Sequence, residues 1–178
     1  MEKNIMHFNE CAKLVDNEKD VDYVNSMYGT LLASESDPLQ TMLDVQKKSQ
    51  DSLAQKYDWV PSIDGLETCG DILSWLKQQD DAIADETREL YTSLGGMSNG
   101  DKEASAAWKW WKARHKEMSD KKFAELSPKD QLEVKFEMID QLHFILCKFL
   151  ALGMDAESIF KLYMLKNAEN LRRWNNGY

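Results

Sequence analysis

The sequence predicts an all-α protein, a helical bundle of about five to seven helices. Alternation of β-branched residues is scarce, and each of the three prolines stands at a boundary between expected elements. The apolar content of 43% supports a hydrophobic core, and 178 residues is close to the usual length of one domain. We therefore expect residues 1–178 to form a single all-α domain.

Two helices are expected in the first half of the chain. Asp37 stands directly before a proline, the pattern of an N-cap followed by proline at the first helical position, which predicts a helix over about 38–57. Thr68 and Asp71 have the spacing of a capping box. They predict a second helix that ends at the glycine pair 95–96.

Three more helices are expected in the second half. One is predicted from residue 102 to about 118, after a short loop. Ser127, again followed by proline, starts the next helix, which should stop at Gly153. Asp155 can cap a last helix that precedes a turn at 175–177.

Composition argues against several classes of partner. A net charge of -9 opposes binding to a nucleic-acid backbone, which requires many basic contacts. The longest nearly apolar stretch, residues 144–154, is far shorter than the roughly 20 residues that cross a bilayer. Three cysteines without metal-ligand spacing indicate neither a disulfide framework nor a zinc site, and no signal-peptide pattern follows Met1. We expect a cytoplasmic protein that binds neither membrane nor nucleic acid.

Two pairs of acidic residues are the main candidates for chemistry. Glu86 and Glu89 form one pair, Glu137 and Asp140 the other, and each pair has the i, i+3 spacing that puts both carboxylates on one helix face. Two such helices packed together would bring four carboxylates into one place. Carboxylate oxygens are the ligands that Mg²⁺ prefers, and Mg²⁺ usually completes its shell with water and substrate phosphates. The pairs therefore predict a magnesium site for cleavage of a phosphate ester or anhydride.

The alternative for these pairs is a solvated helix face. With 31 acidic residues, chance alone gives roughly five acid pairs at this spacing. The second pair stands out because Phe136, Ile139 and Leu142 surround it, and carboxylates in a buried segment need a partner or a metal. A di-iron site is disfavoured, because Asp140-x-x-His143 has no second copy. We expect His143 to be a core residue or to lie beside the site.

Two basic segments allow two main interpretations each, and for residues 108–116 nucleic-acid binding is a third, minor one in view of the net charge of -9. Residues 108–116 combine three tryptophans with four Lys or Arg residues, which suits stacking on a nucleobase with phosphate contacts, or an amphipathic helix that buries its tryptophans. Lys166, Asn170 and Arg173 share one helix face. That face could bind phosphate oxygens, or it could be a cationic helix C-terminus that suits the helix dipole.

Taken together and in this order, the motifs resemble the dimeric dUTPase branch of the all-α NTP pyrophosphatases. The likeness covers nearly the whole chain, through both acid pairs, the run at 108–112, His143-Phe144, and the stretch 166–178. It implies that family's fold, a homodimer, and Mg²⁺-dependent hydrolysis of dCTP, and also dUTP, to the monophosphate and pyrophosphate. The phage members of the branch are the most similar, which implies control of the deoxynucleotide pool during phage DNA synthesis in the cytoplasm of the infected host.

The resemblance also assigns roles to single residues. It implies that Glu86, Glu89, Glu137 and Asp140 are catalytic magnesium ligands, and that one of the glutamates orients the attacking water. It implies two residues near the base, Gln46 and Trp75. The residues that it implies for phosphate contact or site closure are Lys112, Lys166, Asn170, Arg173 and Tyr178.

Two departures from the family pattern qualify these roles. The two acid pairs are separated by 47 intervening residues, more than is usual, which predicts an inserted helical excursion around residues 95–127. Ser49 and Gln50 stand where the dUTPase pattern favours Asn, which predicts relaxed selectivity for uracil. The rival functions are a dUTP-specific or broad house-cleaning NTP pyrophosphatase and, from another class, a non-catalytic acidic helical adaptor whose acid pairs face solvent.

Overall fold

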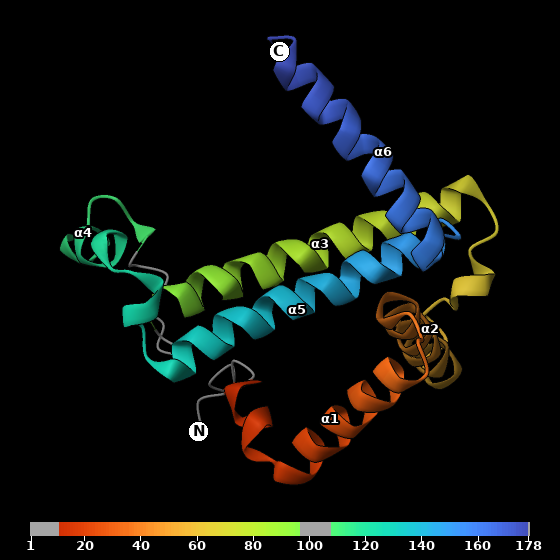
Figure 1. Ribbon diagram of the computed structural model, residues 1–178, viewed down its shortest axis with the longest axis horizontal. Coiled ribbons are helices and arrows are strands. Elements are labelled where there is room, and N and C mark those ends of the chain that lie inside the picture. The colour runs from red at the N-terminus through yellow and green to blue at the C-terminus, as the bar shows by residue number, and fades with distance from the viewer. Residues whose placement is uncertain (1–10, 97–107, 178) are drawn as a thin grey trace. The chain divides into compact units, whose positions relative to one another are not determined.

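The computed structural model in Figure 1 describes residues 11–96 and 108–177. Every regular element in these two ranges is helical, which confirms the predicted all-α class. In chain order the elements are η1 (Cys11–Asp16), α1 (Glu18–Ala33), α2 (Pro38–Lys56), η2 (Ile63–Gly65), α3 (Cys69–Leu94), α4 (Ala113–Asp120), η4 (Phe123–Glu125), α5 (Pro128–Ala151) and α6 (Ala156–Asn175).

The chain divides into two compact units, and each is described by itself. The first consists of the described parts of residues 1–30 and 80–144, and the second of the described parts of 31–79 and 145–178. The boundaries fall inside α1, α3 and α5. The single domain over 1–178 stays a prediction.

Local capping interactions start the helices where the sequence predicted. The Asp37 carboxylate accepts hydrogen bonds from the main-chain N–H groups of Leu39 (2.8 Å) and Gln40 (3.2 Å) at the start of α2. Thr68 and Asp71 form the reciprocal capping box of α3, with N–H to side-chain oxygen distances of 2.9 and 3.1 Å. These bonds satisfy N–H groups that have no partner within the first turn.

The same holds in the second half of the chain. Ser127 Oγ accepts from the Asp130 N–H at 3.0 Å, and Asp155 accepts from the Ser158 N–H at 2.8 Å. Gly96 has φ 79°, a left-handed conformation that glycine adopts without steric cost, directly after α3 ends. The predicted boundaries of α2, α3, α5 and α6 are therefore confirmed to within a few residues.

Each unit has its own apolar cluster. In the second unit, Ile63, Trp75, Cys147 and Ala151 are buried together against partly buried Leu66 and Leu150. In the first unit, Met118 and Leu126 are buried against Leu94 and Trp108. No helix in the described residues has both the length and the apolar composition that crossing a membrane requires.

The helix predicted over 102–118 is confirmed in its described part only from residue 113 onward. Residues 108–112 are not α-helical, and α4 begins only at Ala113, while 102–107 lie outside the described residues. The Trp108 indole N–H donates to the Tyr91 carbonyl at 2.5 Å, and Arg114 donates to the Gly95 carbonyl at 3.4 Å. These two contacts hold the Trp108 and Arg114 side chains against the end of α3. The predicted excursion around 95–127 contains only α4 and η4 as described helices.

Sequence reasoning also missed two elements, η1 and α1. The sequence does carry signals for α1: Val21, Val24, Tyr28 and Leu31 recur at helical spacing, and Glu18 and Asp20 in the first turn suit the positive end of the helix dipole. None of the residues of α1 is buried in the structure.

Candidate functional site

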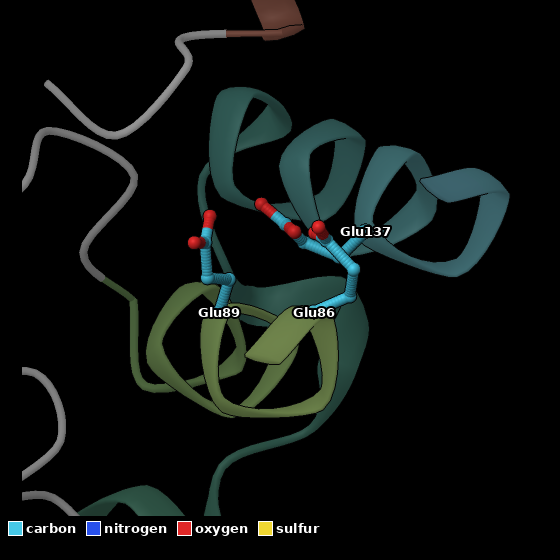
Figure 2. A group of neighbouring side chains, drawn as sticks. All are labelled: Glu86, Glu89 and Glu137. Carbon is cyan, nitrogen blue, oxygen red and sulfur yellow. The ribbon is translucent and has the colours of Figure 1, made fainter. Parts of the chain in front are cut away.

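Three of the four predicted metal-ligand carboxylates meet in the first unit. Glu86 and Glu89 lie on α3 and Glu137 lies on α5, and each offers an oxygen within 4.8 Å of the others. Figure 2 shows Glu86 and Glu89 extending from α3 toward α5, and Glu137 extending toward them. The i, i+3 spacing explains the shared face of the first pair, and the neighbouring helix supplies the third carboxylate.

The fourth predicted ligand, Asp140, lies one turn after Glu137 but outside this group of three. Its negative charge still raises the pKa of Glu86, Glu89 and Glu137, so it belongs to the same electrostatic environment. One Asp140 oxygen lies 3.6 Å from Nδ1 of His143. His143 was predicted to lie either in the core or beside the site. It is exposed, so the core position is wrong, and its contact with Asp140 places it beside a predicted ligand.

Burial and the mutual repulsion of the carboxylates disfavour the ionised forms of Glu86, Glu89 and Glu137, and so raise their pKa values. Glu137 is 5% exposed, and its pKa is raised to about 8, first by burial and then by the charges of Glu89, Glu86, Asp140 and Glu133. Burial is also the largest cause of the raised pKa of Glu86 and of Glu89. A site that holds several carboxylates against this repulsion is typical of a functional centre.

Sequence reasoning missed Glu133 as a member of this environment. It lies one turn before Glu137 on α5, is 1% exposed, and its charge contributes to the raised pKa of Glu137. The signal was present in the sequence, since Glu133 and Glu137 have i, i+4 spacing inside the same apolar segment.

The residues of this cluster fit a divalent cation with hard oxygen ligands. All the donor atoms are carboxylate oxygens from two helices, the chemistry that Mg²⁺ and not a soft metal prefers. A bound cation would replace the repulsion among the three carboxylates with attraction, and it would favour their ionised forms.

The pKa shift of Glu137 makes a testable prediction for the metal-free protein. The folded state retains a proton on Glu137 over the window from about pH 4.5 to 8, whereas the unfolded chain releases it. Stability should therefore fall as the pH rises through this window. We expect Tm measured in EDTA to drop by about 5 °C or more between pH 6 and pH 9.

The matched control is Glu137→Gln, which cannot titrate at this position. The decline in Tm of this variant over the same pH range should be shallower, because only the other titratable groups of the protein then change its stability with pH. Parallel declines in the two proteins would mean that Glu137 does not hold the proton.

The two predicted base-proximal residues meet in the second unit. The Gln46 side-chain amide donates through Nε2 to Cys147 Sγ at 3.2 Å, and the Trp75 indole N–H donates to the Cys147 carbonyl at 3.3 Å. Trp75 and Cys147 are 5% and 3% exposed, and burial raises the pKa of the Cys147 thiol. Cys147 was not predicted as a site residue, because its contact with Gln46 spans 101 positions of sequence.

The side-chain amide of Gln50, a residue predicted to relax selectivity for uracil, forms a hydrogen bond within the protein. It is buried and donates through Nε2 to the Pro61 carbonyl at 2.8 Å, which ties α2 to the loop before η2. Its neighbour Ser49 is exposed.

The predicted phosphate-contacting residues are not brought together in one unit. Lys112, the exposed N-cap of α4, lies in the same unit as the three carboxylates, whereas Lys166, Asn170 and Arg173 lie on α6 in the second unit. Arg173 donates to Glu169 at 2.7 Å, and the hydrogen bonds from Arg172 and then from Arg173 lower the pKa of that carboxyl to about 2. Tyr178 lies outside the described residues.

The tryptophan-rich segment divides between its two interpretations. Trp108 is partly buried against the Met118 and Leu126 cluster, as the amphipathic interpretation requires, though not within an α-helix. Trp110 and Trp111 are 77% and 61% exposed and meet edge to face. Their indole faces are therefore the ones open to a ligand.

Three known proteins are similar to this chain over most of its length. It is 60% identical to the dCTP pyrophosphatase of Enterobacteria phage LZ5 over 97% of the chain and 99% of that relative. It is 54% identical to the dCTP pyrophosphatase of Enterobacteria phage T4, with the same two coverages. A DNA replication protein of Enterobacteria phage T4 is 54% identical over 90% of the chain, but over only 40% of its own length. No protein-family model and no solved structure matches the chain.

Proposed function

Because the chain belongs to the dCTP pyrophosphatase family of phages, whose members are enzymes, we propose that it hydrolyses dCTP with the help of Mg²⁺. Water is consumed, the bond between the α and β phosphates is broken, and the products are dCMP and pyrophosphate. The observation that carries this proposal is the meeting of Glu86, Glu89 and Glu137 at one partly buried place. We also propose dUTP as a second substrate and control of the deoxynucleotide pool in the host cytoplasm as the purpose.

In the proposed reaction, the four carboxylates form the catalytic centre. Glu86, Glu89, Glu137 and Asp140 would hold Mg²⁺, and one of the glutamates would accept a hydrogen bond from the attacking water and so orient it. When bound, Mg²⁺ polarises phosphate oxygens and bound water. Burial of Glu137 keeps bulk water away from that side of the cluster, so interactions there are less screened.

Other residues would supply binding rather than chemistry. Lys112 would offset charge on the triphosphate from the same unit as the carboxylates. Gln46 and Trp75 would contact the pyrimidine, and their shared link to Cys147 supports treating them as one group. Lys166, Asn170, Arg173 and Tyr178 keep the phosphate-contacting or site-closing roles that the resemblance implies.

The decisive test is pyrophosphate release from dCTP, dUTP, dTTP and CTP at equal concentrations, with Mg²⁺ and with EDTA. We expect turnover confined to dCTP and dUTP and dependent on Mg²⁺. Turnover of dUTP alone, or of all four nucleotides, would favour the dUTP-specific or the broad house-cleaning rival. No turnover by folded protein would favour the adaptor, although that rival required solvent-facing acid pairs and Glu137 is buried.

We further propose that the enzyme is a homodimer and that α6 contributes to the interface. Apolar residues repeat along one face of this helix and are all exposed, namely Phe160, Tyr163, Met164, Leu171 and Trp174. We call them the α6 stripe. An exposed apolar stripe of this length is typical of a helix that packs against a partner.

Leu171→Glu tests this interface against Leu162→Glu. Both leucines are exposed, at 48% and 55%, but Leu162 lies on the opposite side of α6 from the stripe. We expect Leu171→Glu to raise the dimer dissociation constant by about tenfold or more, because it places a charge in an apolar contact. Sedimentation equilibrium measures this, and equal effects of the two substitutions would rule out the stripe.

A further inference from the structure

Cys147 holds two side chains through two different atoms. Its thiol sulfur accepts from Gln46 Nε2 at 3.2 Å, and its main-chain carbonyl accepts from the Trp75 indole at 3.3 Å. Because only the first contact uses the side chain, a substitution at position 147 removes the link to Gln46 and leaves the link to Trp75 available. This separation makes the Gln46 contact testable by itself.

The contact with sulfur gives the Gln46 amide a direction. A glutamine amide has a donor end, Nε2, and an acceptor end, Oε1, which a rotation of 180° exchanges. With Nε2 directed to the Cys147 sulfur, Oε1 is the end left for another partner. Cys147 is 3% exposed and packs with Ile63, Trp75 and Ala151, so its sulfur has a defined position.

We infer that Cys147 is a positioning residue that fixes the orientation of the Gln46 amide and thereby favours cytosine over uracil. The inference rests on the proposed function, in which Gln46 contacts the pyrimidine. Cytosine carries an amino donor at C4, whereas uracil carries a carbonyl acceptor there. The Oε1 end of the amide accepts from the cytosine amino group, and only a reversed amide can donate to the uracil carbonyl.

The test compares two substitutions that differ by one hydroxyl group. Cys147→Ala removes the acceptor and frees the amide to reverse. In Cys147→Ser, the hydroxyl hydrogen can bond to the carbonyl one turn earlier in α5, which leaves an oxygen to accept from Gln46 Nε2. Both proteins are given dCTP and dUTP in one mixture, and the ratio of the two kcat/KM values is measured.

We expect Cys147→Ala to lower the dCTP to dUTP ratio by about fivefold, the effect of losing one hydrogen bond of ordinary strength. Cys147→Ser should remain within about twofold of wild type. The exposed Cys69 supplies the control, since Cys69→Ala should leave the ratio unchanged. The ratio does not depend on the fraction of folded enzyme, because both nucleotides meet the same molecules. Inhibition of dCTP turnover by dCMP and by dUMP measures the same preference from binding alone.

Three results would overturn the inference while dCTP turnover persists. These are an unchanged ratio in Cys147→Ala, equal shifts in the alanine and serine variants, and a shift in Cys69→Ala of the same size. If neither variant at 147 folds, Gln46→Glu replaces them, since its two carboxylate oxygens keep an acceptor in either orientation and should raise the ratio. An unchanged or lower ratio there contradicts the inference. Absence of dCTP turnover in the wild type would instead contradict the proposed function.

Discussion

Glu137→Gln is expected to lower kcat for dCTP by about 10²–10⁴-fold and, in EDTA at pH 9, to raise Tm above that of wild type. The loss of activity follows because the amide is a weaker metal ligand and cannot hold negative charge. The gain in stability follows because Glu137 is 5% exposed and repelled by the carboxylates around it, and glutamine removes that repulsion without changing the shape of the side chain. Steady-state kinetics and thermal unfolding on one preparation measure both effects.

The opposite directions of these two effects separate a functional carboxylate from a structural one. Substitution of a residue that only supports the fold would lower the activity and the stability of the protein together. Asp81→Asn, an exposed position on α3, is the control and should leave both quantities near their wild-type values. If Glu137→Gln turns over dCTP within a few-fold of the wild-type rate, the carboxylate cluster does not take part in the reaction.

Removal of divalent cations is expected to reduce dCTP turnover to the uncatalysed background, and added Mg²⁺ should restore it. Without nucleotide, Mg²⁺ should also raise Tm, because it binds the folded protein and offsets the repulsion among Glu86, Glu89 and Glu137. Since the pKa of Glu137 is about 8 without metal, binding at pH 7 should release protons. Calorimetry in buffers of different ionisation enthalpy counts these protons.

Glu137→Gln again serves as the control, since it should release fewer protons on Mg²⁺ binding than wild type. Full turnover in EDTA would exclude a metal-dependent reaction. Mg²⁺ binding with identical proton release in both proteins would place the metal away from Glu137.

Much of the fold was predictable because its signals are local. An N-cap satisfies N–H groups two or three residues away, so Asp37, Thr68, Ser127 and Asp155 mark helix starts without knowledge of tertiary contacts. The same reasoning failed for residues 108–112. There the Trp108 indole bonds to the Tyr91 carbonyl, 17 positions earlier in the chain, a contact that no local pattern of the sequence indicates.

The candidate site divides in the same way. Helical periodicity puts residues at i and i+3 on one face, so the shared face of Glu86 and Glu89 follows from their spacing alone. The packing of α3 against α5 is what brings Glu137 to them, and it leaves Asp140 outside this group of three although its charge raises the pKa of Glu137. The contact between Cys147 and Gln46 likewise could not be predicted, since residues 101 positions apart meet through the way helices pack and not through any spacing along the chain.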